Sequence, residues 1–459
     1  MRKRTILLYI ALFFVLKSFA QSFVFDDISY SITSSINKTV SVTSGINSSG
    51  EIVIPSFVTI DDEEYKVTSI GENAFYGCLD LTKITISNNV TCIEDNSFYG
   101  CSDLRTVTIP SSVQSIGGNS FMGCQNIDTL YWDSKVLYYC ITQYCKEKLE
   151  YVVLGQSVTN IGQYAFYGCS RLTTITIPES VTSIGYGAFS GCTGLTTITI
   201  PESVTRIGDG AFSGCTGLTM ITIPESVTSI GYRAFIGCTG LTSVAIPESV
   251  TSIGRDAFFA CDNIDTIFWG SNITPYELTQ FCKNNLKCVF LGSNVNSIGH
   301  YAFLGCTGLT TITIPESVTR IGDGAFSGCT GLTMITIPEE VITIGDYSFN
   351  GCSGLTTITI PNSVTSIGQY AFSGCTGLTM IAIPNGVTSI KRNAFLNCSV
   401  LATISFPSSI GNVGEDAFKG TAWYERQPNG LVYAGNVIYK YKGIMPDKTK
   451  LIIEDERNR

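Results

Sequence analysis

Thirteen of the 18 cysteines in this 459-residue chain stand on a 23-residue grid, at Cys78, Cys101, Cys124, Cys169, Cys192, Cys215, Cys238, Cys261, Cys306, Cys329, Cys352, Cys375 and Cys398. Each one closes the same phrase, seen most fully as LTTITIPESVTRIGDGAFSGC at 195–215. A fixed short period is typical of a solenoid, in which each copy forms one coil and buries its apolar face only against neighbouring coils. The period therefore predicts a repeat solenoid of some fifteen coils and favours binding along an extended surface over chemistry in a pocket.

The first part of each coil is predicted to be a strand. Leu195, Ile198 and Ile200 form an apolar stripe with alternation at its end. This pattern predicts a strand that turns Thr197 and Thr199 outward.

The second part of the coil returns the chain to the next strand. Pro201 ends the first strand because it has no N–H for a ladder. Val204 and Ile207 predict a second short extended segment, and Phe212 and Cys215 should fill the interior from a short turn. A phenylalanine recurs at the same place along the array, which predicts an aromatic spine beside the cysteines. These residues are Phe75, Phe98, Phe121, Phe166, Phe189, Phe212, Phe235, Phe258, Phe303, Phe326, Phe349, Phe372, Phe395 and Phe418.

The grid also argues against a disulfide framework. Equivalent residues of neighbouring coils lie about 4.8 Å apart with parallel side chains. A disulfide needs converging Cβ atoms about 3.8 Å apart. Buried, reduced thiols are therefore predicted. The off-grid cysteines are Cys92, Cys140, Cys145, Cys282 and Cys288, of which Cys282 and Cys288 could pair with each other. Zinc is disfavoured because the chain has no Cys-x-x-Cys spacing and a single histidine, His300.

Two steps of 45 residues interrupt the grid, between Cys124 and Cys169 and between Cys261 and Cys306. Each begins with a similar line, NIDTLYW at 126–132 and NIDTIFW at 263–269. Each continues with helical spacing, at 139–149 and 276–286, and returns through YVVLG at 151–155 or CVFLG at 288–292. Each step is predicted to be two coils in which a longer amphipathic helix replaces the usual turn. These helical variant coils lie near 125–168 and 262–305.

The ends of the chain differ from the repeats. Residues 1–20 resemble a secretory signal peptide, with Arg2, Lys3 and Arg4 before an apolar run and a small-x-small site at 18–20. Alternating strands at 21–64 are predicted to cap the solenoid, which spans 65–421. Residues 422–459 are predicted to form a β-hairpin or cap that turns at 428–430, or a truncated segment.

The charge balance narrows the class of partner. The chain carries 28 basic and 37 acidic residues, and loss of the signal peptide would leave 24 basic residues and a net charge of −13. An acidic surface argues against nucleic acid or anionic lipid as the partner. No later apolar stretch is long enough to span a bilayer, so a secreted or cell-surface protein is expected, with no integral membrane segment after cleavage.

The phrase L-x-x-I-x-I-P-x-S-V-x-x-I-G-x-x-A-F-x-x-C resembles the BspA-like class of leucine-rich repeats, found on surface proteins of bacteria and some protists. The resemblance covers roughly 65–418. It implies a β-rich leucine-rich-repeat solenoid, with one parallel strand, a second short extended segment and a short turn per coil. It also implies adhesion to extracellular-matrix or plasma proteins. The generic leucine-rich repeat has an asparagine after the strand, whereas this chain has serine, as at Ser180, Ser203, Ser226 and Ser249.

Two exposed surfaces of the predicted coils are candidate binding sites. The outward strand face would contact a protein or a glycan through rows of threonine and methionine, although threonine also suits a solvated strand. Its residues are Thr174, Thr176, Thr197, Thr199, Met220, Thr222, Thr311, Thr313, Met334 and Thr336. The loop pair before each Ala-Phe varies between coils and offers residue types that are common at interface hot spots. Its candidates are Tyr186, Tyr232, Arg233, Arg255 and Tyr301.

Other sites have weaker support. Glutamates follow the strand prolines, as at Glu179 and Glu202, and form either a solvated edge or a row that attracts Ca²⁺ or a basic ligand. Thr-x-Thr arrays also resemble ice-binding surfaces, but Ala245, Ala382 and the methionines interrupt them. No catalytic residue, metal site or cofactor is predicted, and no enzyme is expected. The expected function is adhesion to extracellular or host proteins, or to glycans. The alternative is a structural spacer or a self-associating scaffold, and the oligomeric state stays open.

Overall fold

The computed structural model describes residues 22–45, 48–137, 141–272 and 276–445. The chain forms a β-solenoid of about 16 turns with little helix, as predicted. It divides into two compact units. The N-terminal unit comprises residues up to 242 together with 252–261, and the C-terminal unit comprises 243–251 together with 262 onward. The predicted signal peptide lies outside the described residues.

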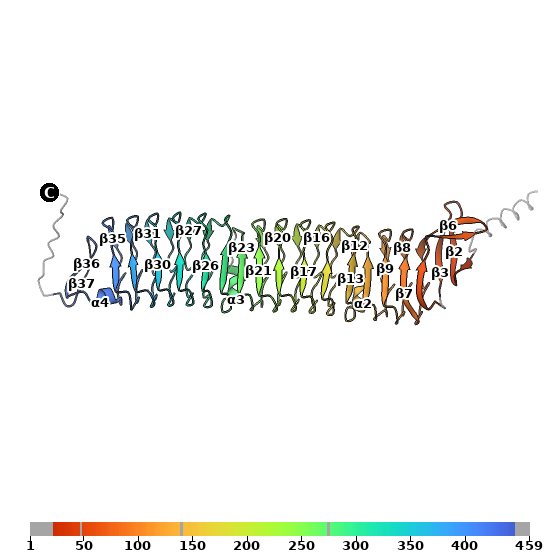
Figure 1. Cartoon of the computed structure of the whole chain (residues 1–459), viewed down its shortest axis with the longest axis horizontal. Helices are drawn as coiled ribbons and strands as arrows, with labels where there is room; N and C mark the ends of the chain where they lie inside the picture. The colour runs from red at the N-terminus through yellow and green to blue at the C-terminus, as the bar shows by residue number, and fades with distance from the viewer. Residues whose placement is uncertain (1–21, 46–47, 138–140, 273–275, 446–459) are drawn as a thin grey trace, which may run out of the picture. The chain divides into compact units, whose positions relative to one another are not determined.

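The outward strands of the N-terminal unit stack in parallel (Figure 1). They are β4 (Gly50–Ile54), β7 (Leu81–Ile86), β9 (Thr106–Ile109), β11 (Thr129–Trp132), β13 (Tyr151–Leu154), β15 (Thr174–Thr176), β17 (Thr197–Thr199) and β19 (Met220–Thr222). The second extended segments are two-residue strands that pair in parallel, the first two in one sheet and the other six in another. They are β8 (Cys92–Ile93), β10 (Ser115–Ile116), β12 (Val136–Leu137), β14 (Asn160–Ile161), β16 (Ser183–Ile184), β18 (Arg206–Ile207), β20 (Ser229–Ile230) and β22 (Ser252–Ile253).

The C-terminal unit repeats this arrangement. Its outward strands are β21 (Ser243–Ile246), β23 (Thr266–Trp269), β24 (Cys288–Leu291), β26 (Thr311–Thr313), β28 (Met334–Thr336), β30 (Thr357–Thr359), β32 (Met380–Ala382) and β34 (Thr403–Ser405). Its second segments are β25 (Ser297–Ile298), β27 (Arg320–Ile321), β29 (Thr343–Ile344), β31 (Ser366–Ile367), β33 (Ser389–Ile390) and β35 (Asn412–Val413).

The third side of each coil is an irregular turn that is also hydrogen-bonded to the next coil. Phe166 N donates to Ala188 O at 2.7 Å, and Gly168 N donates to Ser190 O at 2.7 Å. The same pattern recurs in other coils of both units. Backbone groups are therefore paired between neighbours on all three sides, which satisfies the polar groups of a buried turn.

The predicted inner files of phenylalanine and cysteine are present in each unit. Successive phenylalanine rings stack with centroids 5.0–5.3 Å apart in the N-terminal unit and 5.2–5.4 Å apart in the C-terminal unit. The grid cysteines are buried and free. Most donate from Sγ to the carbonyl of the phenylalanine in the preceding coil, at 3.0–3.2 Å. The prediction of reduced core thiols is confirmed.

Serine side chains link neighbouring coils by hydrogen bonds at the position where the generic repeat has asparagine. Ser180 Oγ donates to Val158 O at 2.6 Å, and Ser226 Oγ donates to Val204 O at 2.7 Å. The same bond forms where no proline precedes the serine, since Ser134 Oγ donates to Val113 O at 2.8 Å and Ser271 Oγ donates to Val250 O at 2.7 Å.

A short helix replaces the usual turn in each variant coil. These helices are α2 (Thr142–Cys145) and α3 (Tyr276–Cys282). Within the described residues, both are shorter than the predicted ranges of 139–149 and 276–286. In a standard coil, the alanine carbonyl of the next turn accepts from the phenylalanine N–H. Here Thr142 Oγ1 donates to Ala165 O at 2.5 Å, and Thr279 Oγ1 donates to Ala302 O at 2.6 Å.

Four of the off-grid cysteines lie within the described residues. Cys145 and Cys282, which break the 23-residue spacing, are buried core residues of the variant coils. Burial is the first cause that raises the pKa of Cys145, followed by the charge of Cys169, as expected for neighbours in one file. The suggested disulfide between Cys282 and Cys288 does not form, and Cys288 is half-buried on a strand.

Additional strands flank the repeats at each end. Ahead of the first coil lie β1 (Ser22–Phe25), β2 (Ile28–Ser34), β3 (Thr39–Ser44), β5 (Phe57–Ile60) and β6 (Glu63–Ile70). After the last coil lie α4 (Ala422–Glu425), β36 (Gly430–Ala434) and β37 (Val437–Lys442). Strands β36 and β37 pair antiparallel, and the turn that joins them lies between Ala434 and Val437 rather than at 428–430, with Gly435 at φ +62°. The proposed cap boundaries stay predictions.

Candidate binding surface

All ten predicted strand-face residues point outward and are exposed. In the N-terminal unit, Thr174 lies opposite Thr197, and Thr176 lies opposite Thr199, so each pair continues a row across parallel strands. In the C-terminal unit, Met334 lies opposite Thr357. Met220 and Met334 are 56% and 65% exposed, which places soft apolar groups among the hydroxyls.

The five predicted loop residues, Tyr186, Tyr232, Arg233, Arg255 and Tyr301, are also exposed. In the N-terminal unit the Arg233 guanidinium lies 4.8 Å from the centre of the Tyr232 ring. Arg233 and Arg255 both approach the Asp256 carboxylate, at 3.6 and 3.9 Å. This aromatic and cationic group is therefore held together by its own contacts.

The second residue of each variable loop pair has a left-handed backbone. Tyr164, Arg233, Tyr301, Tyr347 and Tyr370 have φ between +53° and +58°. Glycine occupies the same position in three other coils, as Gly187, Gly210 and Gly324. A bulky residue in this region costs on the order of 1–2 kcal/mol relative to glycine. Several coils therefore keep an exposed large side chain at a position where glycine fits better.

The variant coils place larger apolar side chains on the same strand face, and sequence reasoning missed them. Tyr131, Tyr151 and Val153 are 43%, 65% and 53% exposed on β11 and β13. In the C-terminal unit, the exposed rings of Phe268 and Phe290 stack with centroids 5.0 Å apart. The alternation in NIDTLYW and NIDTIFW could have predicted these exposed side chains. Leu130 and Trp132 point inward, so Tyr131 between them must point outward.

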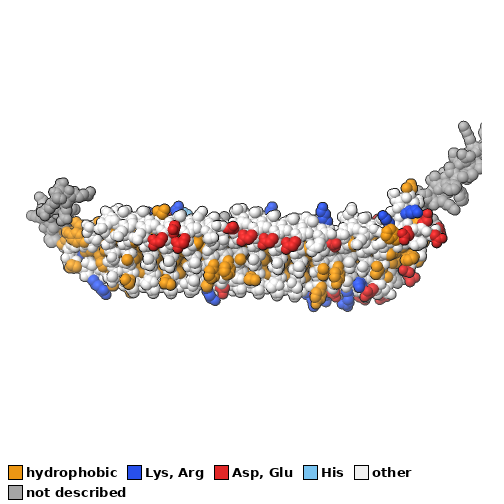
Figure 2. Space-filling view, turned by 45° about the horizontal axis from the view of Figure 1, so that its top comes forward, with side chains coloured by type: hydrophobic (Ala, Val, Ile, Leu, Met, Phe, Trp, Pro, Cys, Tyr) orange, Lys and Arg blue, Asp and Glu red, His pale blue; other side chains and the backbone are white. Residues whose placement is uncertain are grey.

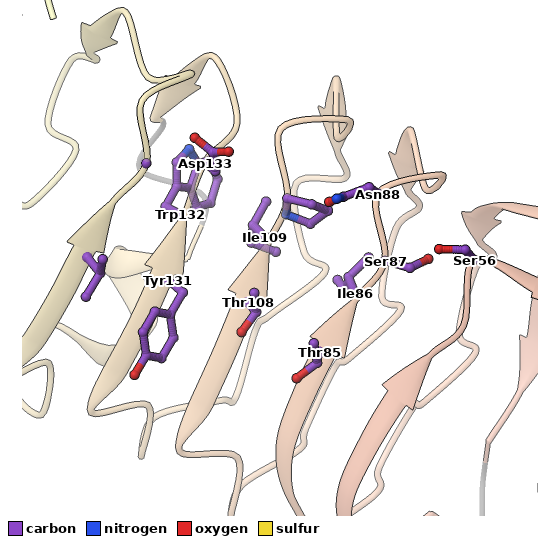
Figure 3. Close-up of a pocket in the computed structure, with 13 residues that line it drawn as sticks. Ser56, Thr85, Ile86, Ser87, Asn88, Thr108, Ile109, Tyr131, Trp132 and Asp133 are labelled. Carbon is purple, nitrogen blue, oxygen red and sulfur yellow. The ribbon is translucent and has the colours of Figure 1, made fainter. Parts of the chain in front are cut away.

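A groove of about 530 Å³ crosses the carboxyl ends of β7, β9, β11 and β13. Figure 3 shows Thr85, Thr108 and Tyr131 in a row on three neighbouring strands, with Ser87, Asn88 and Asp133 beyond the strand ends. The strand register confirms this row, since Thr85 lies opposite Thr108 and Thr108 lies opposite Tyr131. Val153 lies on the other side of Tyr131 and also lines the groove.

Within each unit, acidic side chains form a row on the face seen in Figure 2. The glutamates that follow the strand prolines are exposed: Glu179, Glu202 and Glu225 in the N-terminal unit and Glu248, Glu316 and Glu339 in the C-terminal unit. Glu316 lies beside Glu340, whose carboxyl raises the pKa of Glu316. Among the described residues, no group of three or more His, Cys, Asp or Glu side chains is placed to hold a metal ion.

The single histidine, His300, contacts Asp323 of the following coil. Its Nδ1 accepts from Asp323 N at 3.0 Å and lies 3.2 Å from the Asp323 carboxylate. In other coils an aspartate holds this position, as where Asp209 Oδ1 accepts from Tyr232 N at 2.9 Å. His300 therefore serves as a turn cap that links one coil to the next.

Comparison with known proteins identifies relatives of the repeat array. The family model of the BspA type leucine-rich repeat region (6 copies) matches overlapping segments at 68–196, 139–265, 188–309, 217–333 and 296–424. A leucine-rich repeat protein from Bacteroides ovatus ATCC 8483 is 32% identical, with 79% of this chain and 95% of that chain covered and a TM-score of 0.42. A leucine-rich cell surface protein from Faecalibacterium prausnitzii A2-165 is 31% identical, with 78% and 93% covered and a TM-score of 0.34.

A leucine-rich repeat protein from Eubacterium ventriosum ATCC 27560 is 21% identical, with 87% of this chain and 94% of that chain covered and a TM-score of 0.29. No curated protein matches the chain. Within the described ranges, no helix has the length and apolar character needed to cross a bilayer.

Proposed function

Because the chain belongs to the BspA-type leucine-rich-repeat family, we propose that it is a secreted or cell-surface interaction protein without enzymatic activity. It binds extracellular or host proteins, or glycans, through the strand face. The observation that carries this proposal is the set of exposed apolar side chains on that face, including Tyr131 and Met220 in the N-terminal unit and Phe268 and Met334 in the C-terminal unit. Exposed apolar groups on a rigid sheet are typical of interaction sites.

The loop residues form a second contact surface in this proposal. Tyr232 and Arg233 offer hot-spot side chains, and the left-handed backbone at Arg233 supports a role that outweighs local strain. The acidic net charge and the lack of a basic stripe in the sequence favour a partner other than nucleic acid. The competing function is a spacer or scaffold with no ligand, which does not require exposed aromatic side chains.

A binding screen against extracellular-matrix and plasma proteins tests the proposal. We expect saturable binding that the double variant Thr197→Lys/Thr311→Lys weakens by roughly tenfold or more, because long charged side chains would disrupt the contact face. The matched control is Thr205→Lys/Thr319→Lys, which makes the same change at exposed positions off the strand face. A spacer predicts no saturable binding, and equal loss in both double variants would assign the effect to charge alone.

A further inference from the structure

We propose that the groove along Thr85, Thr108 and Tyr131 binds a neutral oligosaccharide. This inference rests on the proposed interaction function and names the ligand class for one part of the strand face. A sugar ring would lie on the exposed face of Tyr131, and its hydroxyl groups would bond to the side chains at the strand ends. The groove lies entirely within the N-terminal unit.

The aromatic ring offers a flat apolar surface of the right kind. Tyr131 is 43% exposed, and its neighbours in the row are Thr108 and Val153. Pyranose rings carry C–H groups on one face, and such a face packs on an aromatic ring without requiring charge. The groove volume of about 530 Å³ lies within the range of small-ligand sites.

The polar groups around the ring have unused hydrogen-bonding capacity. Among the described residues, none makes a hydrogen bond to the side chains of Thr85, Thr108 or Asn88, which line the groove. An amide and two hydroxyls provide donors and acceptors, the mixture that sugar hydroxyls need. Ser87 Oγ, which also lines the groove, is buried without a partner among the described residues. Such a hydroxyl is costly unless something bonds to it.

Asp133 supplies a fixed acceptor at the edge of the groove. Its Oδ1 accepts from Ser157 N at 2.9 Å, and its own N–H donates to Ile109 O at 2.9 Å. These contacts hold the carboxylate in place, and Oδ2 has no hydrogen bond to a described residue. A fixed carboxylate oxygen is suited to accept from one or two sugar hydroxyls.

The lining disfavours other ligand classes. No lysine or arginine lines the groove, so phosphate groups of a nucleic acid or acidic sugars would lack a counter-charge. Strands β7, β9 and β11 each have a partner on both sides, so an extended peptide finds no free strand edge to pair with. A neutral polyhydroxyl ligand makes no demand for either feature.

The test is calorimetric titration of the full chain with four probes, the hexasaccharides of β-1,4-glucose, α-1,4-glucose, β-1,4-xylose and α-mannose. We expect saturable binding of at least one probe. Tyr131→Ala should weaken it by about tenfold through loss of the stacking surface, while Tyr131→Phe should retain it. Asn88→Ala, at an exposed position, should also weaken it and keeps the proposal testable if Tyr131→Ala does not fold.

Tyr433→Ala is the matched control, because Tyr433 is also an exposed tyrosine on a strand but lies in the C-terminal hairpin, outside the strand face and the groove. It should leave oligosaccharide binding within about twofold. Absence of binding by all four probes, or binding that Tyr131→Ala and Asn88→Ala leave unchanged, would overturn the proposal. Protein binding that survives such a result would uphold the broader function, since the Thr197→Lys/Thr311→Lys test does not involve the groove.

Discussion

The cysteine side chains of the coil interior are chemically protected. Each Sγ of the file lies among apolar groups, and burial raises the pKa of Cys169, Cys215, Cys306 and Cys352 to about 12. A thiol reacts as its thiolate, so these sulfurs should be inert at neutral pH. Cys92 and Cys288 differ, because they are half-buried on strands.

Thiol labelling of the native chain tests this protection. At pH 7.5, a maleimide or a disulfide reagent should modify Cys92 and Cys288 and leave the fifteen buried cysteines among the described residues unmodified until denaturant is added. Peptide mapping by mass spectrometry identifies the modified sites. Rapid labelling of Cys215 in the native chain would contradict a closed interior.

The raised pKa values also predict alkaline destabilisation. An unfolded thiol begins to ionise near its ordinary pKa of 9.0, whereas the folded Cys169 and Cys215 thiols hold their protons to about pH 12. The unfolded state therefore binds fewer protons as the pH rises between these values. Below about pH 9, each such thiol makes its full contribution to the free energy of unfolding. Above about pH 9, the free energy of unfolding falls by about 1.4 kcal/mol per pH unit for each such thiol. Denaturant midpoints measured with a reductant at pH 8 and 10 check this, and equal midpoints would contradict it.

At the scale of the element, the variant coils show how a helix can enter a solenoid without breaking it. The inward hydroxyls of Thr142 and Thr279 bond to alanine carbonyls of the next turn. These carbonyls would otherwise lose the N–H that a standard turn provides. The helices therefore continue the hydrogen bonding between coils through side chains.

Thr142→Val removes this bond and leaves the Ala165 carbonyl buried without its donor. We expect a loss of roughly 1–3 kcal/mol in the free energy of unfolding, because an unsatisfied buried acceptor bears its full desolvation cost. Thr142→Ser keeps the hydroxyl, so its free energy of unfolding should fall clearly less than that of Thr142→Val. Denaturant unfolding followed by circular dichroism compares the two, and equal losses would show that the methyl group, rather than the hydroxyl, matters.

Most of the coil could be predicted from the sequence because each feature has a local cause. The apolar spacing within one repeat predicts the strand and the buried Phe212 and Cys215. The proline predicts where the strand ends. The core position of Cys145 could not be predicted, because the helix changes the number of residues in the coil. The Cys145 side chain nevertheless reaches the core. The groove at Tyr131 was missed for a different reason. It depends on which side chains lie opposite each other on neighbouring strands, and that becomes visible only once the register is known.

At the scale of the whole molecule, the standard coils of both units bond to their neighbours through the same backbone groups, and the variant helices add a threonine hydroxyl in place of one of them. Residues 193–225 and 307–339 are identical in sequence, so the same coil surface is used in both units. In such an array, stability is approximately a sum of coil terms and interface terms. Folding should then depend more on keeping the 23-residue period than on the number of coils.

Deletion of residues 193–215, one full repeat, should leave a folded chain, because Cys192 would join Thr216 in the frame that Thr193 held. Deletion of residues 193–204 should disrupt folding, because it breaks the alignment of inward and outward positions. Far-UV circular dichroism and resistance to protease compare the two variants. Similar behaviour of both would contradict a fold held by register.

The row of buried thiols also determines how fast the protein is inactivated by oxidation outside a reducing compartment. While the coils stay closed, an oxidant in the medium finds few targets. Once a coil opens, several thiols emerge together, and wrong cross-links between them would prevent reclosure. The working lifetime is then a matter of kinetics, limited by the opening rate of the coil that holds its neighbours most weakly.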